Sequence, residues 1–68
     1  MKYKIEIWQF HSITDTHKSN TIKEILKWYR EKWQIAFEYC NCTFYVYKNG
    51  KLMEFDELFK LGFYDVED

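Results

Sequence analysis

The sequence contains no proline and only two glycines, and no long run of apolar residues appears in its 68 positions. A membrane-spanning helix needs roughly 18 to 20 consecutive apolar residues, so none is predicted. Charged and apolar side chains alternate from Lys2 to Glu6, which is unlike the apolar stretch of a secretory signal peptide. We therefore expect a cytoplasmic protein that makes no contact with a membrane.

An excess of basic charge is also missing. Ten Lys and Arg residues are balanced by eleven Asp and Glu, which gives a formal net charge of −1 at pH 7. Proteins that bind nucleic acid mainly by electrostatics usually carry a clear positive excess. Direct binding of nucleic acid is therefore disfavoured, although residues 18–32 hold five basic side chains against two acidic ones.

The motifs of common catalytic sites are absent as well. Ser12 and Ser19 lie in a polar stretch without the glycines of a nucleophile elbow, and the sequence has no glycine-rich phosphate loop. A Cys–His pair could in principle act as a nucleophile, but so short a chain has little volume for a walled pocket. We predict that the protein is not an enzyme.

The chain is rich in apolar side chains: 47% of its residues are hydrophobic and 22% are aromatic. This apolar surface can offset the conformational entropy lost on folding, so we predict an ordered chain. No repeat or linker divides the sequence, and residues 1–68 fit a single small domain. Residues 65–68 form an acidic end that we expect to fray.

The first half of the chain has clear periodicities. Residues 2–10 alternate between apolar and polar positions and predict a strand, whereas the polar residues 11–20 predict a loop. Thr21 and Glu24 have the spacing of a capping box at the start of a helix. The apolar stripe of this helix consists of Ile22, Ile25, Leu26, Tyr29 and Trp33.

The second half, from residue 35 to 47, is rich in β-forming residues. Asn49 and Gly50 are typical of a type I′ turn, which would join a strand at 43–48 to one at 51–55. Asp56 could cap a short helix over 57–61 that ends at Gly62. The predicted fold is α+β: a small three- to four-stranded antiparallel sheet with one main helix on one face. Its order is strand, helix, strand, strand and a short C-terminal helix.

A two-residue turn determines which side chains of the hairpin share a face. The predicted pairs are Lys48 with Lys51, Tyr47 with Leu52, Val46 with Met53, Tyr45 with Glu54, and Phe44 with Phe55. One long helix can cover only one face of the sheet. If Ile5 and Ile7 point toward that helix, the open face carries the side chains of Trp8, Phe10, Tyr45, Tyr47, Leu52 and Glu54.

Exposed apolar patches commonly mark sites of protein interaction. We therefore predict that Trp8, Phe10, Tyr45 and Tyr47 bind a partner protein. The predicted secondary contacts are Trp28, Asp65 and Glu67. Three alternatives stay open: residues 35–41 cover this face, the C-terminal segment with Leu58, Phe59, Phe63 and Tyr64 covers it, or two copies form a homodimer through it. The acidic end could contact a basic partner or act only as a solubilising tail.

Two histidines and two cysteines are the only soft metal ligands in the sequence: His11, His17, Cys40 and Cys42. Four such ligands can hold a zinc ion, which would stabilise so small a domain. Their spacing is not that of a standard zinc motif, and reduced thiols with surface histidines are the alternative. With zinc bound, the chain would be a small nucleic-acid-binding or regulatory module.

Residues 22–33 and 45–51 resemble segments of small proteins encoded by phages and prophages of low-GC Gram-positive bacteria, and the span from 22 to 51 covers roughly half of the chain. In size, acidity and expected architecture the chain is similar to anti-CRISPR inhibitors of type II effector nucleases. The resemblance implies a stoichiometric inhibitor of a host protein, acting in the cytoplasm of the bacterial host. That class shares no common motif, so the resemblance assigns no residue a role.

Overall fold

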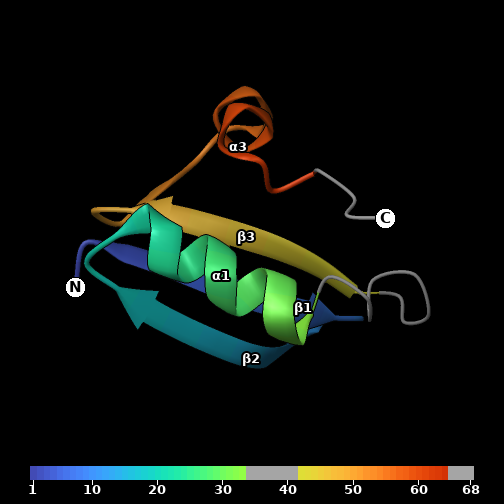
Figure 1. The fold of residues 1–68 in the computed structure, drawn as a ribbon. Coiled ribbons are helices and arrows are strands. Elements are labelled where there is room, and N and C mark those ends of the chain that lie inside the picture. Colours follow the sequence, from blue (N-terminus) through green and yellow to red (C-terminus); the bar gives the residue numbers. More distant parts are fainter. Residues whose placement is uncertain (34–41, 65–68) are drawn as a thin grey trace.

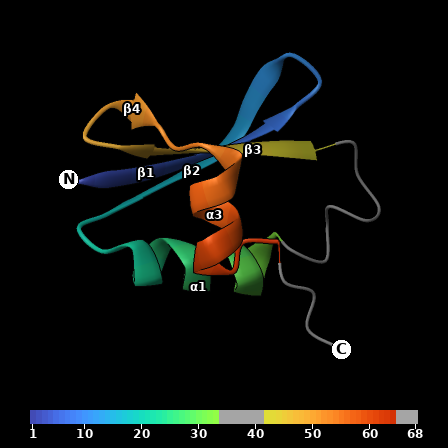
Figure 2. The same cartoon turned by 90° about the horizontal axis from the view of Figure 1, so that it is seen from above.

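The computed structural model describes residues 1–33 and 42–64. Its elements are β1 (Tyr3–Gln9), β2 (Ser12–Ser19), α1 (Ile22–Lys32), β3 (Cys42–Lys48), β4 (Lys51–Leu52) and α3 (Phe55–Leu61) (Figure 1). The strands form one antiparallel sheet in the order β2-β1-β3-β4. Both helices lie on the same side of this sheet (Figure 2). The predicted α+β fold with a small antiparallel sheet is confirmed.

Helix α1 begins as its capping signal predicts. Thr21 is extended, and its hydroxyl accepts a hydrogen bond from the backbone N–H of Glu24 at 3.3 Å. The helix ends at Lys32, and the N–H of Trp33 closes the last turn by donating to the carbonyl of Tyr29 at 2.8 Å. Neither helix in the described part of the chain is long and apolar enough to cross a membrane.

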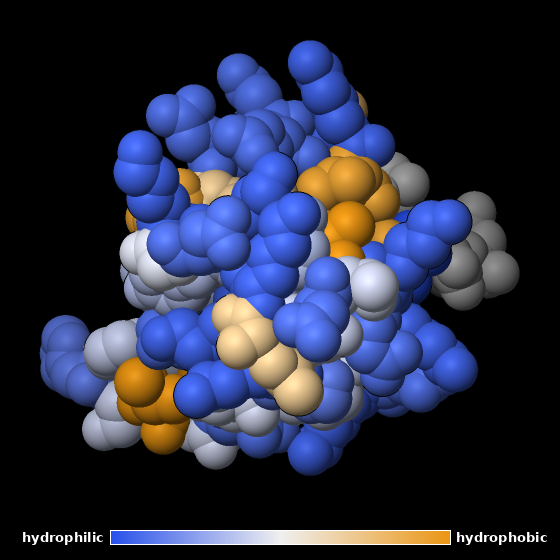
Figure 3. All heavy atoms as spheres, turned by 90° about the vertical axis from the view of Figure 1, so that its left-hand side faces the viewer, coloured by the Kyte–Doolittle hydropathy of each residue, from blue (hydrophilic) through white to orange (hydrophobic). Residues whose placement is uncertain are grey.

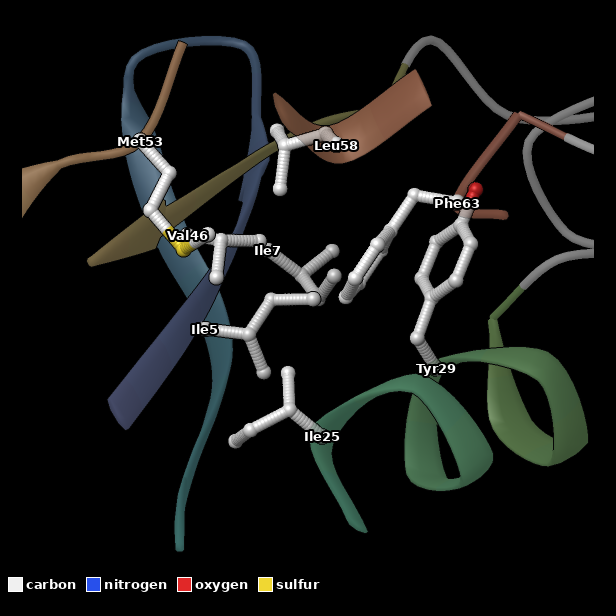
Figure 4. Close-up of a cluster of buried hydrophobic side chains, with 8 residues drawn as sticks. All are labelled: Ile5, Ile7, Ile25, Tyr29, Val46, Met53, Leu58 and Phe63. Carbon is white, nitrogen blue, oxygen red and sulfur yellow. The ribbon is translucent and has the colours of Figure 1, made fainter. Parts of the chain in front are cut away.

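The core lies between the sheet and the two helices. Ile5, Ile7 and Val46 are fully buried on the helix side of the sheet, as the alternation of β1 predicts. They pack in one cluster with side chains from the helices, the residue after β4 and the C-terminal segment, namely Ile25, Tyr29, Met53, Leu58 and Phe63 (Figure 4). Each such burial stabilises the fold by about 1.5 to 3 kcal/mol.

The segment 11–20 is a strand and not the loop that its polarity predicts. Phe10 and His11 form the turn between β1 and β2, with Phe10 at a φ of 58°. Strand β2 is an edge strand, and its helix-facing positions include Asp15 and His17. These polar side chains are accommodated because side chains of α1 and Trp33 pair with them.

The β3–β4 hairpin forms at Asn49 and Gly50, with φ values of 52° and 80°. The pairs Lys48 with Lys51 and Tyr47 with Leu52 are confirmed, and the N–H of Met53 donates to the carbonyl of Val46 at 2.7 Å. Strand β4 then ends, so the predicted pairs of Tyr45 with Glu54 and Phe44 with Phe55 are wrong. The chain leaves the sheet at this point and continues into α3, because burial of Leu58 in the core stabilises that path.

Helix α3 begins at Phe55, two residues earlier than predicted. Glu54 occupies the N-cap position without a side-chain hydrogen bond, so the predicted cap at Asp56 is wrong. Asp56 and Glu57 instead lie in the first turn, where negative charge interacts favourably with the helix dipole. The helix ends as predicted at Gly62, whose φ of 94° suits glycine. The segment 35–41, which is rich in β-forming residues, and the acidic end 65–68 lie outside the described residues.

Candidate functional site

The side of the sheet opposite the helices is the candidate site, which we call the outer face. Strand pairing arranges its side chains in three cross-strand rows. The first row is Lys18, Lys4, Tyr47 and Leu52; the second is Thr16, Glu6 and Tyr45; the third is Ile13, Trp8 and Thr43. No helix or strand formed by residues 1–33 and 42–64 lies over these rows (Figure 2).

Glu6 lies at the centre of the outer face and connects three of its side chains. Its carboxylate forms an ion pair with Lys4 at 3.1 Å and accepts a hydrogen bond from the indole N–H of Trp8 at 3.2 Å. Burial raises the pKa of Glu6, but interactions with Lys4, Trp8 and Tyr47 outweigh it, so the pKa is lowered from its usual value of 4.5. The carboxylate therefore stays ionised at neutral pH.

The aromatic rings of the outer face have defined orientations. Trp8 and Tyr45 meet edge to face, with ring centroids 6.2 Å apart and an interplanar angle of 88°. The ammonium of Lys4 lies over the ring of Tyr47 at 4.8 Å. Burial raises the pKa of Tyr47, and the charge and hydrogen bond of Glu6 raise it further. The same carboxylate thus holds Trp8 in place and interacts electrostatically with Tyr47.

Three of the four predicted anchor residues share this surface. Trp8 and Tyr47 are half-buried, and Tyr45 is 39% exposed. Phe10 lies in the β1–β2 turn beyond the last row and is 77% exposed. None of the four is enclosed by the described residues.

Among the predicted secondary contacts, Trp28 does not join the outer face. Trp28 lies on the helix side of the sheet, where its ring stacks on His17 with centroids 5.0 Å apart and an interplanar angle of 5°. Asp65 and Glu67 lie outside the described residues.

Ile13 and Leu52 add apolar area to the face, with 49% and 55% of their surfaces exposed. Ile13 was missed because residues 11–20 were predicted to be a loop. The signal that could have placed it is the β-branched character of Ile13, Thr14 and Thr16.

Residues 58–64 of the C-terminal segment do not cover the outer face. Leu58 and Phe63 belong to the core on the helix side, with exposures of 4% and 1%. Phe59 and Tyr64 extend from the same segment and remain exposed. The other proposed cover, residues 35–41, lies outside the described residues.

The predicted zinc ligands are dispersed. His11 lies in the β1–β2 turn, whereas His17 lies far along β2 and stacks on Trp28. A strand rises about 3.3 Å per residue, so the two histidines are roughly 15 to 20 Å apart and cannot bind the same ion. The prediction that His11 and His17 belong to one four-ligand zinc site is therefore wrong. Cys40 lies outside the described residues, and among those described no group of three or more His, Cys, Asp or Glu could hold a metal.

Strand β2, one edge of the outer face, is held in place through Asp15. Its carboxylate accepts hydrogen bonds from the indole N–H of Trp33 at 3.0 Å and from the backbone N–H of Thr16 at 2.9 Å. It also forms an ion pair with Lys32 at 3.0 Å. Burial raises the pKa of Asp15, but the bonds from Lys32, Trp33 and Thr16 lower it to below 3.8. These contacts connect the edge strand to the C-terminal end of α1.

Comparisons with known proteins add no functional assignment. No protein-family model matches the chain, and neither a curated protein nor a solved structure does. The geometry of the outer face is therefore the basis on which a function can be proposed.

Proposed function

We propose that this protein is a non-enzymatic inhibitor that binds another protein through its outer face. The supporting observation is that a sheet face with ordered aromatic rings has no helix or strand of the described chain over it. Tyr45, Ile13 and Leu52 expose 39 to 55% of their surfaces there. Tryptophan and tyrosine are enriched among residues that dominate binding energy at protein interfaces.

The Glu6 contacts support binding because they orient the rings before a partner arrives. Ordering a rotamer-rich side chain on binding costs about 0.5 to 1.5 kcal/mol. Trp8 is constrained both by its hydrogen bond to Glu6 and by its contact with Tyr45. A partner that docks here loses less entropy than one that must order free side chains.

The resemblance to phage-encoded proteins directs the proposal to a host protein as the target. A type II CRISPR effector nuclease is the first target to test, since anti-CRISPR inhibitors of that class are similar in size and acidity. Inhibition would occur by stoichiometric occupation of the target's surface.

The test is a titration of target DNA cleavage by a type II effector nuclease with the purified protein. We expect cleavage to stop near an equimolar ratio, with binding measured in parallel by calorimetry. The double variant Trp8→Ala and Tyr45→Ala should weaken binding at least 100-fold, because hot-spot truncations each cost about 2 kcal/mol or more. Phe59→Ala is the matched control, since Phe59 is 58% exposed on α3 and away from the outer face.

Three results would contradict the proposal. Equal losses of binding in the double variant and in Phe59→Ala would show that the outer face is not the docking surface. A stable dimer in light scattering that Trp8→Ala converts to monomer would show that the face instead joins two copies of the chain. For a panel of host proteins, absence of binding to every member would reject the inhibitor function.

A further inference from the structure

Half of the basic side chains of the protein are gathered at one end of the sheet. This end contains the start of β1, the end of β2 and the β3–β4 hairpin. The five lysines there are Lys2, Lys4, Lys18, Lys48 and Lys51, out of ten basic residues in the chain. We call them the lysine end. Figure 3 views this end of the molecule, and its surface is largely hydrophilic.

The strand register places like charges directly opposite one another at this end. Lys4 pairs with Lys18 across β1 and β2, and Lys48 pairs with Lys51 across the hairpin. Like charges in cross-strand pairs destabilise a sheet. The Lys4–Lys18 pair lies on the outer face and the Lys48–Lys51 pair on the helix side of the same end. Folding thus concentrates positive charge at this end of the sheet, even though the whole chain has a net charge of −1.

Few carboxylates offset this charge. Glu6 forms an ion pair with Lys4, and Glu57 borders the hollow beside Lys48 and Lys51. Within the described part of the chain, Lys2, Lys18, Lys48 and Lys51 form no ion pair. The lysine end therefore has a positive excess that an external anion can neutralise.

The lysine end also contains a formed hollow. A cavity of about 210 Å³ is lined by residues that include Lys2, Lys4, Lys18 and Tyr47. The backbone of Lys2 is fixed there, because its N–H donates to the side chain of Asn20 at 3.2 Å and its carbonyl accepts from Asn49 at 2.8 Å. Three lysines and two tyrosines, Tyr3 and Tyr47, thus line the hollow.

We propose that the lysine end binds the phosphate backbone of a single-stranded nucleic acid. Sequence-tolerant binding of single strands combines positive charge that follows the backbone with aromatic rings on which bases stack. Tyr47 lines the hollow, and the exposed ring of Tyr45 lies in the next row of the outer face. An acidic protein bound here would use the positive charge of the lysines, but it would not need the aromatic rings beside them. This inference does not depend on the inhibitor function.

Fluorescence anisotropy with a labelled oligothymidylate tests the proposal on the intact protein. We expect binding that weakens between about 50 and 200 mM salt, with a logarithmic slope of about −0.7 for each phosphate contacted. The double variant Lys2→Gln and Lys18→Gln should reduce affinity about 5- to 10-fold per lysine at low salt and flatten the slope. Lys23→Gln with Lys27→Gln, an equal charge change on exposed positions of α1, should leave binding unchanged.

Three outcomes would overturn the inference. One is no measurable binding of the oligonucleotide at low salt by protein with a native thermal transition. Another is an equal loss in the control pair, because the net charge would then account for the effect. The third is competition by polyglutamate as effective as that by unlabelled oligothymidylate, since this would identify an acidic protein surface as the ligand. If the Lys2→Gln, Lys18→Gln variant still inhibits a nuclease target, the lysine end is not required for the proposed docking function.

Discussion

The carboxylate of Asp15 in β2 lies 3.0 Å from the indole nitrogen of Trp33, and this bond joins the edge strand to the end of α1. The same carboxylate contacts Lys32 and the N–H of Thr16, so one side chain satisfies three donors. We expect Asp15→Ala to lower the free energy of unfolding by about 2 kcal/mol, because hydrogen bonds to charged groups contribute about 1.5 to 3 kcal/mol. Urea unfolding monitored by circular dichroism measures the loss. Thr14→Ala, at an exposed position of the same strand, is the control.

The contribution of Asp15 should depend on pH. Its pKa in the folded protein is lowered from 3.8, so the folded state binds the proton more weakly than the unfolded state does. The stabilisation is therefore complete above the unfolded value and is lost as the pH falls through the folded pKa. The difference in unfolding free energy between the wild type and Asp15→Asn should be constant near neutral pH and shrink below about pH 4. A difference that stays constant down to pH 2 would contradict this account.

Glu6 should control the titration of Tyr47. The Glu6 charge and hydrogen bond raise the pKa of Tyr47 in addition to the effect of burial. In Glu6→Gln the negative charge is gone, so we expect the pKa of Tyr47 to move back toward 10.0. Carbon-13 NMR of the labelled tyrosine ring measures this value site by site. Tyr64, whose raised pKa is due to burial alone, serves as the internal reference and should not move.

Phe10 has a positive φ of 58° in the β1–β2 turn, a conformation that a bulky side chain rarely adopts. It is also 77% exposed, so its ring contributes little to the core. Phe10→Gly should therefore raise the free energy of unfolding by roughly 1 kcal/mol, since glycine adopts positive φ without steric cost. A melting temperature that falls would show that the ring makes a stabilising contact. If the variant is more stable but binds the target more weakly, Phe10 is retained for binding.

His17 and Trp28 stack between β2 and α1. The His17 Nε2 atom is buried and makes no hydrogen bond to the described residues, and the Glu24 carboxylate lies 3.9 Å from it, beyond hydrogen-bond distance. A buried polar atom that lacks a partner costs free energy, whereas the stacked ring stabilises the contact. His17→Phe should therefore match or exceed the wild type in thermal stability. His17→Ala should lower the free energy of unfolding by about 1 to 2 kcal/mol because the ring contact is lost. A larger loss in His17→Phe than in His17→Ala would contradict this interpretation.

Local patterns account for the parts of the fold that were predicted well. Helix α1 was predicted because its apolar stripe and the Thr21 cap involve residues close in sequence. The β3–β4 turn was predicted for a similar reason, since Asn49 and Gly50 adopt positive φ at little cost. Strand β2 was missed because Phe10 and His11 are not a typical turn pair. Its inward side chains gain partners only when Trp28 and Trp33 pack beside it.

The candidate site divides in the same way. Alternation along β1 and β3 was enough to assign Ile5, Ile7 and Val46 to one face and Trp8, Tyr45 and Tyr47 to the other, because side chains alternate along any strand. The bonds around Glu6 and the Lys4–Lys18 pair could not be read from the chain. They follow from the order and register of the strands, which are set by long-range packing of the core against both helices. The periodicity of the sequence thus identified which residues share each face. The tertiary structure of the sheet determined which of them are neighbours.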